Sequence, residues 1–153
     1  MKRKYVLIAL SLILLAVLVT GAYMFLTKNS RILGGMVKNM TLIMKDCEGI
    51  ELIETKSVYG KLNGNGNGVD FFGAVLIKTD SEASVNAAVA RLKDTFRLVE
   101  YTPQRTNLLE SPFLVHKTIY FDHGFDTSGN STYYSVYFIT SHKDSNLLDI
   151  AGH

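Results

Sequence analysis

The sequence predicts an α+β protein in which one N-terminal transmembrane helix is followed by a mainly antiparallel sheet with one packed helix, in the order β-β-β-α-β-β-β. Three observations lead to this fold class. An uncharged apolar run extends from Tyr5 to Leu26. Segments rich in β-branched and aromatic residues, which favour strands, cluster before residue 80 and after residue 96. Between these clusters, residues 81–96 carry apolar side chains at the spacing of one helix face.

The apolar run is long enough to cross a membrane, because a helix from Tyr5 to Leu26 reaches about 33 Å and the hydrocarbon core of a bilayer is about 30 Å thick. Two interpretations remain open. The run is either an uncleaved signal anchor or a signal peptide that is cleaved after Gly21 or Ala22. The apolar core of a signal peptide usually spans about 7–15 residues, and this run is longer. Its length therefore favours the anchor.

Basic residues flank the apolar run on both sides and predict its orientation. Residues 2–4 are Lys, Arg and Lys, whereas Lys28, Arg31 and Lys38 follow the run at wider spacing. Positive charge concentrates on the cytoplasmic side of membrane segments. We therefore expect a single-pass membrane protein with a cytoplasmic N-terminus and an extracytoplasmic C-terminal domain.

The composition divides the chain into three expected parts. Residues 1–26 form the signal anchor or transmembrane helix, residues 27–40 a stalk, and residues 41–153 the extracytoplasmic α+β domain. Gly34 and Gly35 lie in the middle of the stalk and are expected to interrupt any regular element there.

Strand and helix signals follow one another through the expected domain. The helix over residues 81–96 starts next to a residue that can cap it, Asp80 or Ser81. Three Asn-Gly pairs over residues 63–68 predict a hairpin turn, because Asn-Gly tolerates two positive φ angles. Residues 147–150 are expected to form a short closing strand. The other expected strands cover residues 41–47, 50–61, 69–79, 97–102, 113–122 and 131–141.

Charge and cysteine content limit the partners and the compartment. The net charge is +2, but from Thr27 onward the chain holds 13 basic and 14 acidic residues, without the basic stripe that a nucleic-acid backbone attracts. Cys47 is the only cysteine, which excludes an intramolecular disulfide. An exported domain without disulfides fits a bacterial envelope better than an animal secretory pathway. We expect no nucleic-acid partner and no cofactor.

The densest set of possible metal ligands is Asp122, His123 and Asp126. Zinc sites need three or four His, Cys or carboxylate ligands, and a calcium loop needs a closing Glu that this segment lacks. His116 and His123 are seven residues apart, so in one strand they lie on opposite faces. A structural turn is the favoured interpretation. The alternative is a tethered hydrolase or metal-dependent enzyme that uses His116, His123 and Asp122.

Aromatic residues concentrate in the strand expected over residues 131–141. Tyr133, Tyr134 and Tyr137 lie on both sides of this strand, so some belong to the core. The others form either more core or an exposed aromatic patch, a kind of surface that protein interfaces favour. Since the sequence holds no catalytic motif, we expect a non-enzymatic, membrane-tethered envelope protein. Its domain is expected to bind a partner protein through an exposed sheet face or edge.

Two stretches resemble a group of uncharacterised small membrane-anchored bacterial proteins. Residues 59–66, Tyr-Gly-Lys-Leu-Asn-Gly-Asn-Gly, match a glycine-rich hairpin in that group, although Asn65 replaces an acidic residue. The second stretch runs from residues 120–123 through residues 135–137 to residues 147–149, and it lacks the closing tyrosines of the group. The resemblance covers about a third of the chain. It implies an anchor followed by a small α+β domain and implies no activity.

Overall fold

The computed structural model describes residues 2–62, 69–125 and 132–141. In these residues the protein is an α+β chain with an N-terminal apolar helix and a mainly antiparallel sheet, as predicted. The helices are α1 (Lys2–Leu26), α2 (Lys28–Lys45) and α3 (Glu82–Lys93). The strands are β1 (Glu51–Gly60), β2 (Asp70–Thr79), β3 (Leu98–Gln104), β4 (Leu108–Leu109), β5 (Ile119–Tyr120) and β6 (Thr132–Ser141).

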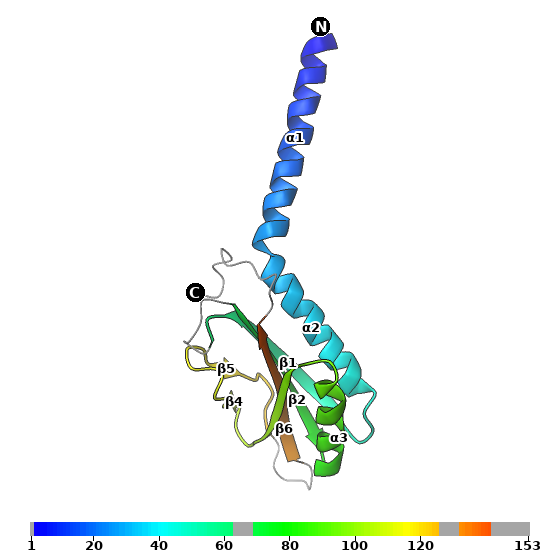
Figure 1. Ribbon diagram of the computed structural model, residues 1–153, viewed down its shortest axis with the longest axis vertical. Helices are drawn as coiled ribbons and strands as arrows, with labels where there is room; N and C mark the ends of the chain where they lie inside the picture. The colour runs from blue at the N-terminus through cyan, green and yellow to red at the C-terminus, as the bar shows by residue number, and fades with distance from the viewer. Residues whose placement is uncertain (1, 63–68, 126–131, 142–153) are drawn as a thin grey trace.

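Four of the strands form one antiparallel sheet in the order β1-β2-β6-β3, and β4 pairs with β5 separately (Figure 1). The pairs Gly60–Asp70 and Asp70–Ser141 align the first three strands at one end of the sheet. The antiparallel pairing of β1 with β2 is what a hairpin requires, while the Asn-Gly pairs themselves lie outside the described residues. This order of strands in the sheet places β2 and β6 in the centre and β1 and β3 at the edges.

Both faces of this sheet are covered, which explains the continuous apolar run in β2. On one face, Phe71 and Val75 pack against α2 and α3. On the other face, Phe72 and Leu76 pack against the segment that contains β4 and β5. All four side chains are fully buried. Because both faces of β2 are buried, apolar residues do not alternate with polar ones along it, and its sequence is nearly continuously apolar.

Helix α2 corrects two expectations. The break expected at Gly34 and Gly35 and the strand expected over residues 41–47 are both wrong, because Lys28–Lys45 is one helix. Its buried apolar side chains, Leu33, Met40 and Met44, are spaced at seven and four residues and share one helix face against the sheet. Gly34 and Gly35 lie on the exposed side and do not interrupt the helix. The apolar run after residue 40 suggested a strand because short apolar runs are ambiguous.

Helix α3 confirms the helix that the sequence predicts over residues 81–96. Ser81 is the N-cap, and its side chain accepts a hydrogen bond from the backbone N–H of Ser84 at 3.3 Å. This bond satisfies one of the free N–H groups of the first turn. The buried side chains are those of the predicted apolar face: Val85, Ala88, Val89 and Leu92.

The strand expected over residues 113–122 is reduced to the two residues of β5. Its partner β4 lies in a stretch expected to be a loop. Leu109, Ile119 and Phe121 of this region are buried on the second face of the sheet. These side chains cover that face of the sheet. An irregular segment with one short strand pair covers it as well as a long strand would. The expected closing strand over residues 147–150 lies outside the described residues.

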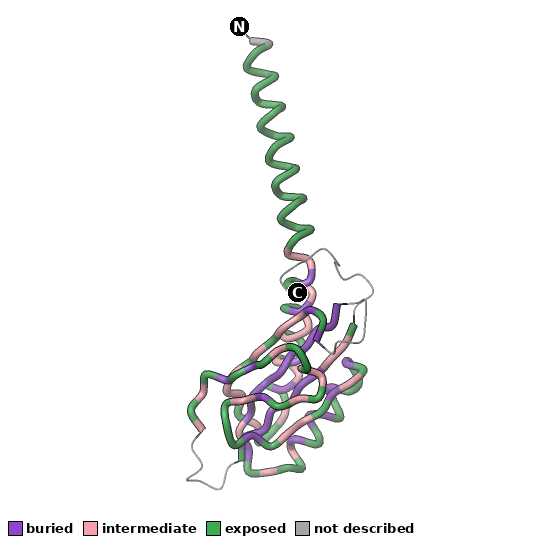
Figure 2. Tube along the Cα trace, turned by 90° about the vertical axis from the view of Figure 1, so that its left-hand side faces the viewer, coloured by how far each residue is buried: buried purple, intermediate pink, exposed green. Residues whose placement is uncertain are grey.

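Helix α1 stands apart from the folded domain. The most apolar stretch within Lys4–Leu26 has a mean hydropathy of 2.6, and none of its residues is buried (Figure 2). By length and composition this helix can cross a membrane.

Candidate functional site

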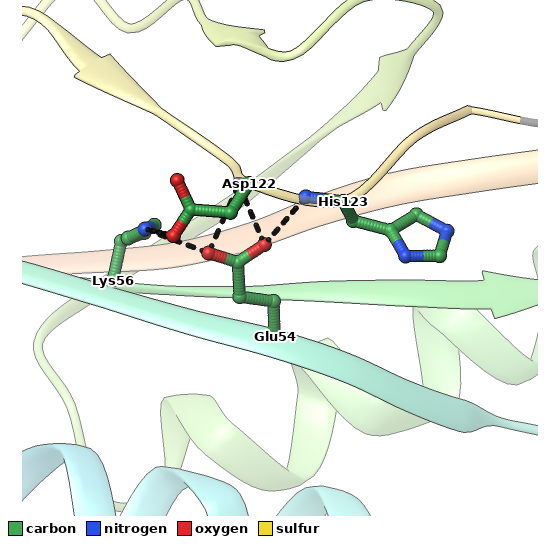
Figure 3. Close-up of polar contacts among 4 residues, drawn as sticks. All are labelled: Glu54, Lys56, Asp122 and His123. Carbon is green, nitrogen blue, oxygen red and sulfur yellow. Dashed lines mark hydrogen bonds and ion pairs between the residues drawn. The ribbon is translucent and has the colours of Figure 1, made fainter.

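The predicted residues Asp122 and His123 lie beside Glu54 and Lys56 of β1 (Figure 3). The Glu54 carboxylate accepts a hydrogen bond from the backbone N–H of Asp122 at 2.9 Å and another from that of His123 at 3.0 Å. Lys56 Nζ lies 2.7 Å from Glu54 Oε1 and 2.7 Å from Asp122 Oδ2. These four residues tie the segment after β5 to the edge strand β1.

A β-bulge precedes Glu54 in β1. Leu52 pairs with Ile77, but Glu54 pairs with Leu76, so Ile53 is an extra residue in β1. A bulge places two successive side chains on the same face of a sheet. Ile53 and Glu54 accordingly share the face covered by β4 and β5, where Ile53 packs against the core. Glu54 pairs with Leu76 and Lys56 pairs with Ala74, two residues that are buried on the face covered by β4 and β5. Regular alternation along β1 therefore places both charged side chains on the face where Asp122 lies.

Lys56 stabilises the charge of both carboxylates, and they stabilise its charge. Burial raises the pKa of the Glu54 carboxyl, but the hydrogen bonds from Lys56 and from the N–H groups of Asp122 and His123 outweigh it and leave the pKa below its usual value. The hydrogen bonds to Asp122 and then Glu54 raise the pKa of Lys56, and the bond from Lys56 lowers the pKa of Asp122. All three groups are charged at neutral pH. Such a cluster suits a structural link between two segments rather than a general acid.

The other predicted metal and catalytic residues do not converge on this cluster. The His123 ring nitrogen Nε2 lies 3.3 Å from the hydroxyl of Tyr133, and the ring packs against Phe125. His116 is exposed, and its backbone N–H donates to Leu62 O at 3.4 Å. Asp126 lies outside the described residues. Within the described part of the chain, no group of three or more His, Cys, Asp or Glu side chains is placed to hold a metal.

The tyrosines for which the sequence left open a core position or an exposed patch are all buried, so they do not form an exposed patch. Tyr133, Tyr134 and Tyr137 are 4%, 8% and 2% exposed. They lie in β6, a central strand whose two faces are both covered. The Tyr137 hydroxyl donates to Glu100 Oε2 at 3.1 Å, and burial raises the pKa of Tyr137. The tyrosines of β6 therefore belong to the apolar cores on the two faces of the sheet.

The sheet edges remain as interaction surfaces, and they differ. An exposed edge offers unpaired N–H and C=O groups to another chain. Strand β1 carries a bulge and the charged pair Glu54 and Lys56, which are devices that discourage pairing. Strand β3 has no bulge and pairs on one side only, with β6, in the sheet formed by the described strands. Pro103 also discourages pairing, so the bulge-free stretch before it, residues 98–102, is the part of this edge that suits another strand.

Pro103 indicates which backbone groups of β3 point outward. Proline has no N–H, so in a sheet it occupies positions whose backbone faces away from the neighbouring strand. Outward and inward positions alternate along an antiparallel strand. The N–H and C=O groups of Val99 and Tyr101 are therefore expected to point outward, on the same side as the C=O of Pro103. Their side chains share the helix-facing side of the sheet, where Val99 is buried.

A groove runs between this edge and α3. Its volume is about 360 Å³, and its apolar lining includes Val89, Ala90 and Val99. Lys93 of α3 lies along the same groove. The Tyr101 hydroxyl donates to Glu82 Oε1 at 3.0 Å, a bond that raises the pKa of Tyr101 and joins the edge strand to the start of α3. Asn86 and Glu100 complete the lining.

The sequence signals for this site are partial. Residues 97–102 are predicted as a strand, and α3 is predicted to pack on the sheet. That β3 is an edge strand depends on the strand order, which no local pattern specifies. Only Pro103 gives a local hint, because proline is confined to edges and bulges in sheets.

Comparisons with protein-family models, with curated proteins and with solved structures found no match. The class of protein therefore follows from the fold and the groove. It is a small α+β domain in which a helix flanks an accessible sheet edge, and it is preceded by a helix long and apolar enough to cross a membrane.

Proposed function

We propose that this protein is a membrane-anchored, non-enzymatic module that binds an extended segment of a partner protein along β3, in the groove against α3. The observation that carries this proposal is the bulge-free edge of β3 beside a groove whose lining combines apolar and polar side chains. Addition of a strand to a sheet edge is a common mode of peptide recognition. It needs neither a catalytic group nor a preformed deep pocket.

The groove specifies the chemistry of the partner segment. The outward N–H and C=O groups of Val99 and Tyr101 supply ladder hydrogen bonds to its backbone. Every second side chain of an added strand faces α3, where Val89 and Ala90 favour small apolar groups. Lys93 at the end of α3 favours an acidic residue on the partner.

The apolar exposed surface of α1 supports the anchor. In water, a fully exposed apolar helix of this length exposes far more apolar surface than soluble proteins tolerate. We propose the uncleaved single-pass arrangement, with the N-terminus in the cytoplasm and the domain in the extracytoplasmic part of the cell envelope. The three basic residues at positions 2–4 support this orientation. The resemblance to small membrane-anchored bacterial proteins supports the same layout.

Photo-crosslinking from the groove tests the binding site. A benzoylphenylalanine residue replaces Asn86, which is exposed and lines the groove, in the full-length chain in native membranes. We expect a crosslinked partner identified by mass spectrometry. Ala90→Arg fills the groove with a long charged side chain and is expected to reduce the crosslinked fraction at least about tenfold, a loss of about 1.4 kcal/mol of binding free energy.

The matched control is Ala87→Arg, the same change on an exposed position of the same helix that lines a different cavity. We expect it to leave the crosslink unchanged. Equal loss in both arginine variants, or no loss in either, would reject β3 and α3 as the binding site.

A further inference from the structure

The junction between α1 and α2 holds the domain directly at the end of the apolar helix (Figure 1). Thr27 donates its N–H to Tyr23 O at 3.0 Å, and Arg31 donates its N–H to Thr27 O at 3.1 Å, so helical hydrogen bonding continues across the junction. Arg31 Nη2 also donates to Met24 O at 2.7 Å. This bond satisfies a carbonyl at the end of α1 that would otherwise lack a helical partner. The connection is therefore short and fixed.

The folded core starts within one turn of this junction. Asn29 is 0% exposed and Leu33 is 4% exposed. Asn29 lies three residues beyond Leu26, which is about 4.5 Å along a helix. The headgroup layer of one leaflet is about 5–7 Å thick. With α1 in a membrane, as the proposed function has it, the nearest part of the domain reaches the lipid headgroups.

One end of the sheet lies at the start of α2. A cavity of about 530 Å³ is lined by Ile32 and Met36 of α2 together with Arg97 and Thr140 at this end of β3 and β6. We define the near end as the described residues of this region: 28–35, 60–62, 70–71, 93–98 and 139–141. We define the far end as the residues at the opposite ends of α2 and the strands: 45–51, 78–84, 104–106 and 132–133.

The two ends carry opposite net charge, although the domain as a whole is nearly neutral. The near end holds five basic and two acidic side chains, which are Lys28, Arg31, Lys61, Lys93, Arg97, Asp70 and Asp94. The far end holds three basic and five acidic side chains, which are Lys45, Lys78, Arg105, Asp46, Glu48, Glu51, Asp80 and Glu82. At the near end, Asp70 is 8% exposed and accepts a hydrogen bond from Ser141, whereas Lys61 and Arg97 are exposed.

We propose that the near end is a docking surface for anionic phospholipid headgroups of the membrane that holds α1. Charge complementarity favours this partner, because basic side chains within a Debye length of an anionic leaflet are attracted to it. The fixed junction adds to this attraction. It holds the basic side chains at the leaflet, so no flexible linker loses conformational entropy when they bind. The acidic far end points away and disfavours the inverted arrangement. The domain therefore sits on the membrane rather than tumbling beside it.

Tryptophan quenching in vesicles tests this docking. The chain has no native tryptophan, so Thr95→Trp places a single reporter on an exposed position of the near end. The full chain is reconstituted in vesicles of phosphatidylcholine, or of phosphatidylcholine with about 30% phosphatidylglycerol, that contain a headgroup-labelled nitroxide lipid. We expect quenching of this reporter to be at least about twofold stronger with phosphatidylglycerol. The difference is expected to vanish in 1 M salt, where the Debye length is about 3 Å.

Three controls make the result specific. Ala83→Trp places the reporter on an exposed far-end position and is expected to show equal quenching in both lipids. The double change Lys61→Gln and Arg97→Gln, made in the Thr95→Trp chain, is expected to abolish the phosphatidylglycerol effect on the near-end reporter. The matched double change at the far end, Lys45→Gln and Arg105→Gln, removes the same charge from exposed positions and is expected to leave the effect intact.

Carbonate extraction of the same vesicles separates the docking from the anchor. Retention in the membrane with equal quenching in both lipids would overturn the docking and leave the anchor standing. Retention with a phosphatidylglycerol effect that survives Lys61→Gln and Arg97→Gln would also overturn it. Release of the full chain by carbonate would overturn the anchor and, with it, the docking that rests on it.

Discussion

At the scale of single residues, Gly73 shows how tightly the central strand is packed. A Cβ atom added at this position would lie 2.5 Å from Phe138 Cε1, 2.8 Å from Phe138 Cζ and 3.0 Å from Val37 Cγ2. The Phe138 ring is itself fixed, because it stacks on Phe96 with ring centroids 4.3 Å apart. The strand therefore needs glycine here for space, so that an aromatic ring can cross its backbone.

We expect Gly73→Ala to destabilise the domain by about 1–3 kcal/mol, as overpacking in a filled core does. The control is Gly34→Ala, because nothing lies within 4 Å of a Cβ added there and alanine is the better helix former. That change is expected to stabilise the domain by up to about 1 kcal/mol. Denaturation of the full chain in detergent, followed by the near-ultraviolet circular dichroism of its tyrosines, measures both. Equal effects of the two substitutions would contradict this packing argument.

The Glu54 cluster predicts a pH dependence of stability. The pKa of Glu54 is lowered in the folded state from an ordinary value of 4.5. The stabilisation it provides is therefore complete above that value and is lost as the pH falls through the folded pKa. We expect Glu54→Gln to cost about 1–3 kcal/mol at pH 7, because charged acceptors make strong hydrogen bonds while the partly exposed ion pair adds little.

The same denaturation measurement, repeated from pH 7 down to pH 2, checks this linkage. The stability difference between the native chain and Glu54→Gln is expected to shrink below about pH 4.5 as the native carboxylate takes up a proton. Glu51→Gln, at an exposed position of the same strand, is the control and is expected to change stability by less than about 0.5 kcal/mol. A difference that stays constant down to pH 2 would rule out the carboxylate as the cause.

At the scale of secondary-structure elements, α2 is the part of the core for which the prediction from sequence is wrong. Local patterns identify α3, with its cap and its apolar face, and the long strands β1, β2 and β6. They fail at α2 because Gly34 and Gly35 suggest a break and the apolar run after residue 40 suggests a strand. The apolar face of α2 is nevertheless present in the sequence. Leu33, Met40 and Met44 are buried, and the residues that pack beside them are Ile32, Met36, Val37 and Ile43.

We therefore expect residues 27–153 to fold without α1, and residues 41–153, which begin at the boundary that the sequence predicts, not to fold. The shorter chain loses Leu33 and Met40, and buried residues of this size contribute about 2–5 kcal/mol each, against a typical total stability of about 5–15 kcal/mol. It also exposes the sheet face that α2 covers. Cooperative urea unfolding of the purified chains tests this, and a cooperative transition in residues 41–153 would show that α2 is dispensable.

At the scale of the whole molecule, the two proposed surfaces are related through the position of β3. Leu98 pairs with Ile139, two residues from the near end of β6 at Ser141. Val99 and Tyr101, which present the outward backbone groups, lie about three to five strand residues from that end, or about 10–17 Å. With the near end on the headgroups, the groove lies just above the membrane. The partner segment is therefore expected to lie close to the bilayer, as the juxtamembrane part of another membrane protein does.

The sequence by itself determined the apolar helix, the α+β class, the strands and helix with strong periodicity and the absence of an intramolecular disulfide. Each depends on composition or on the spacing of nearby residues, which a single chain shows directly. Tertiary structure alone decided that α2 packs on the sheet as part of the core, that Tyr133, Tyr134 and Tyr137 are buried, and that β3 is an edge. These outcomes depend on strand order and on which surfaces meet. Such contacts join residues far apart in the chain, so no local pattern contains them.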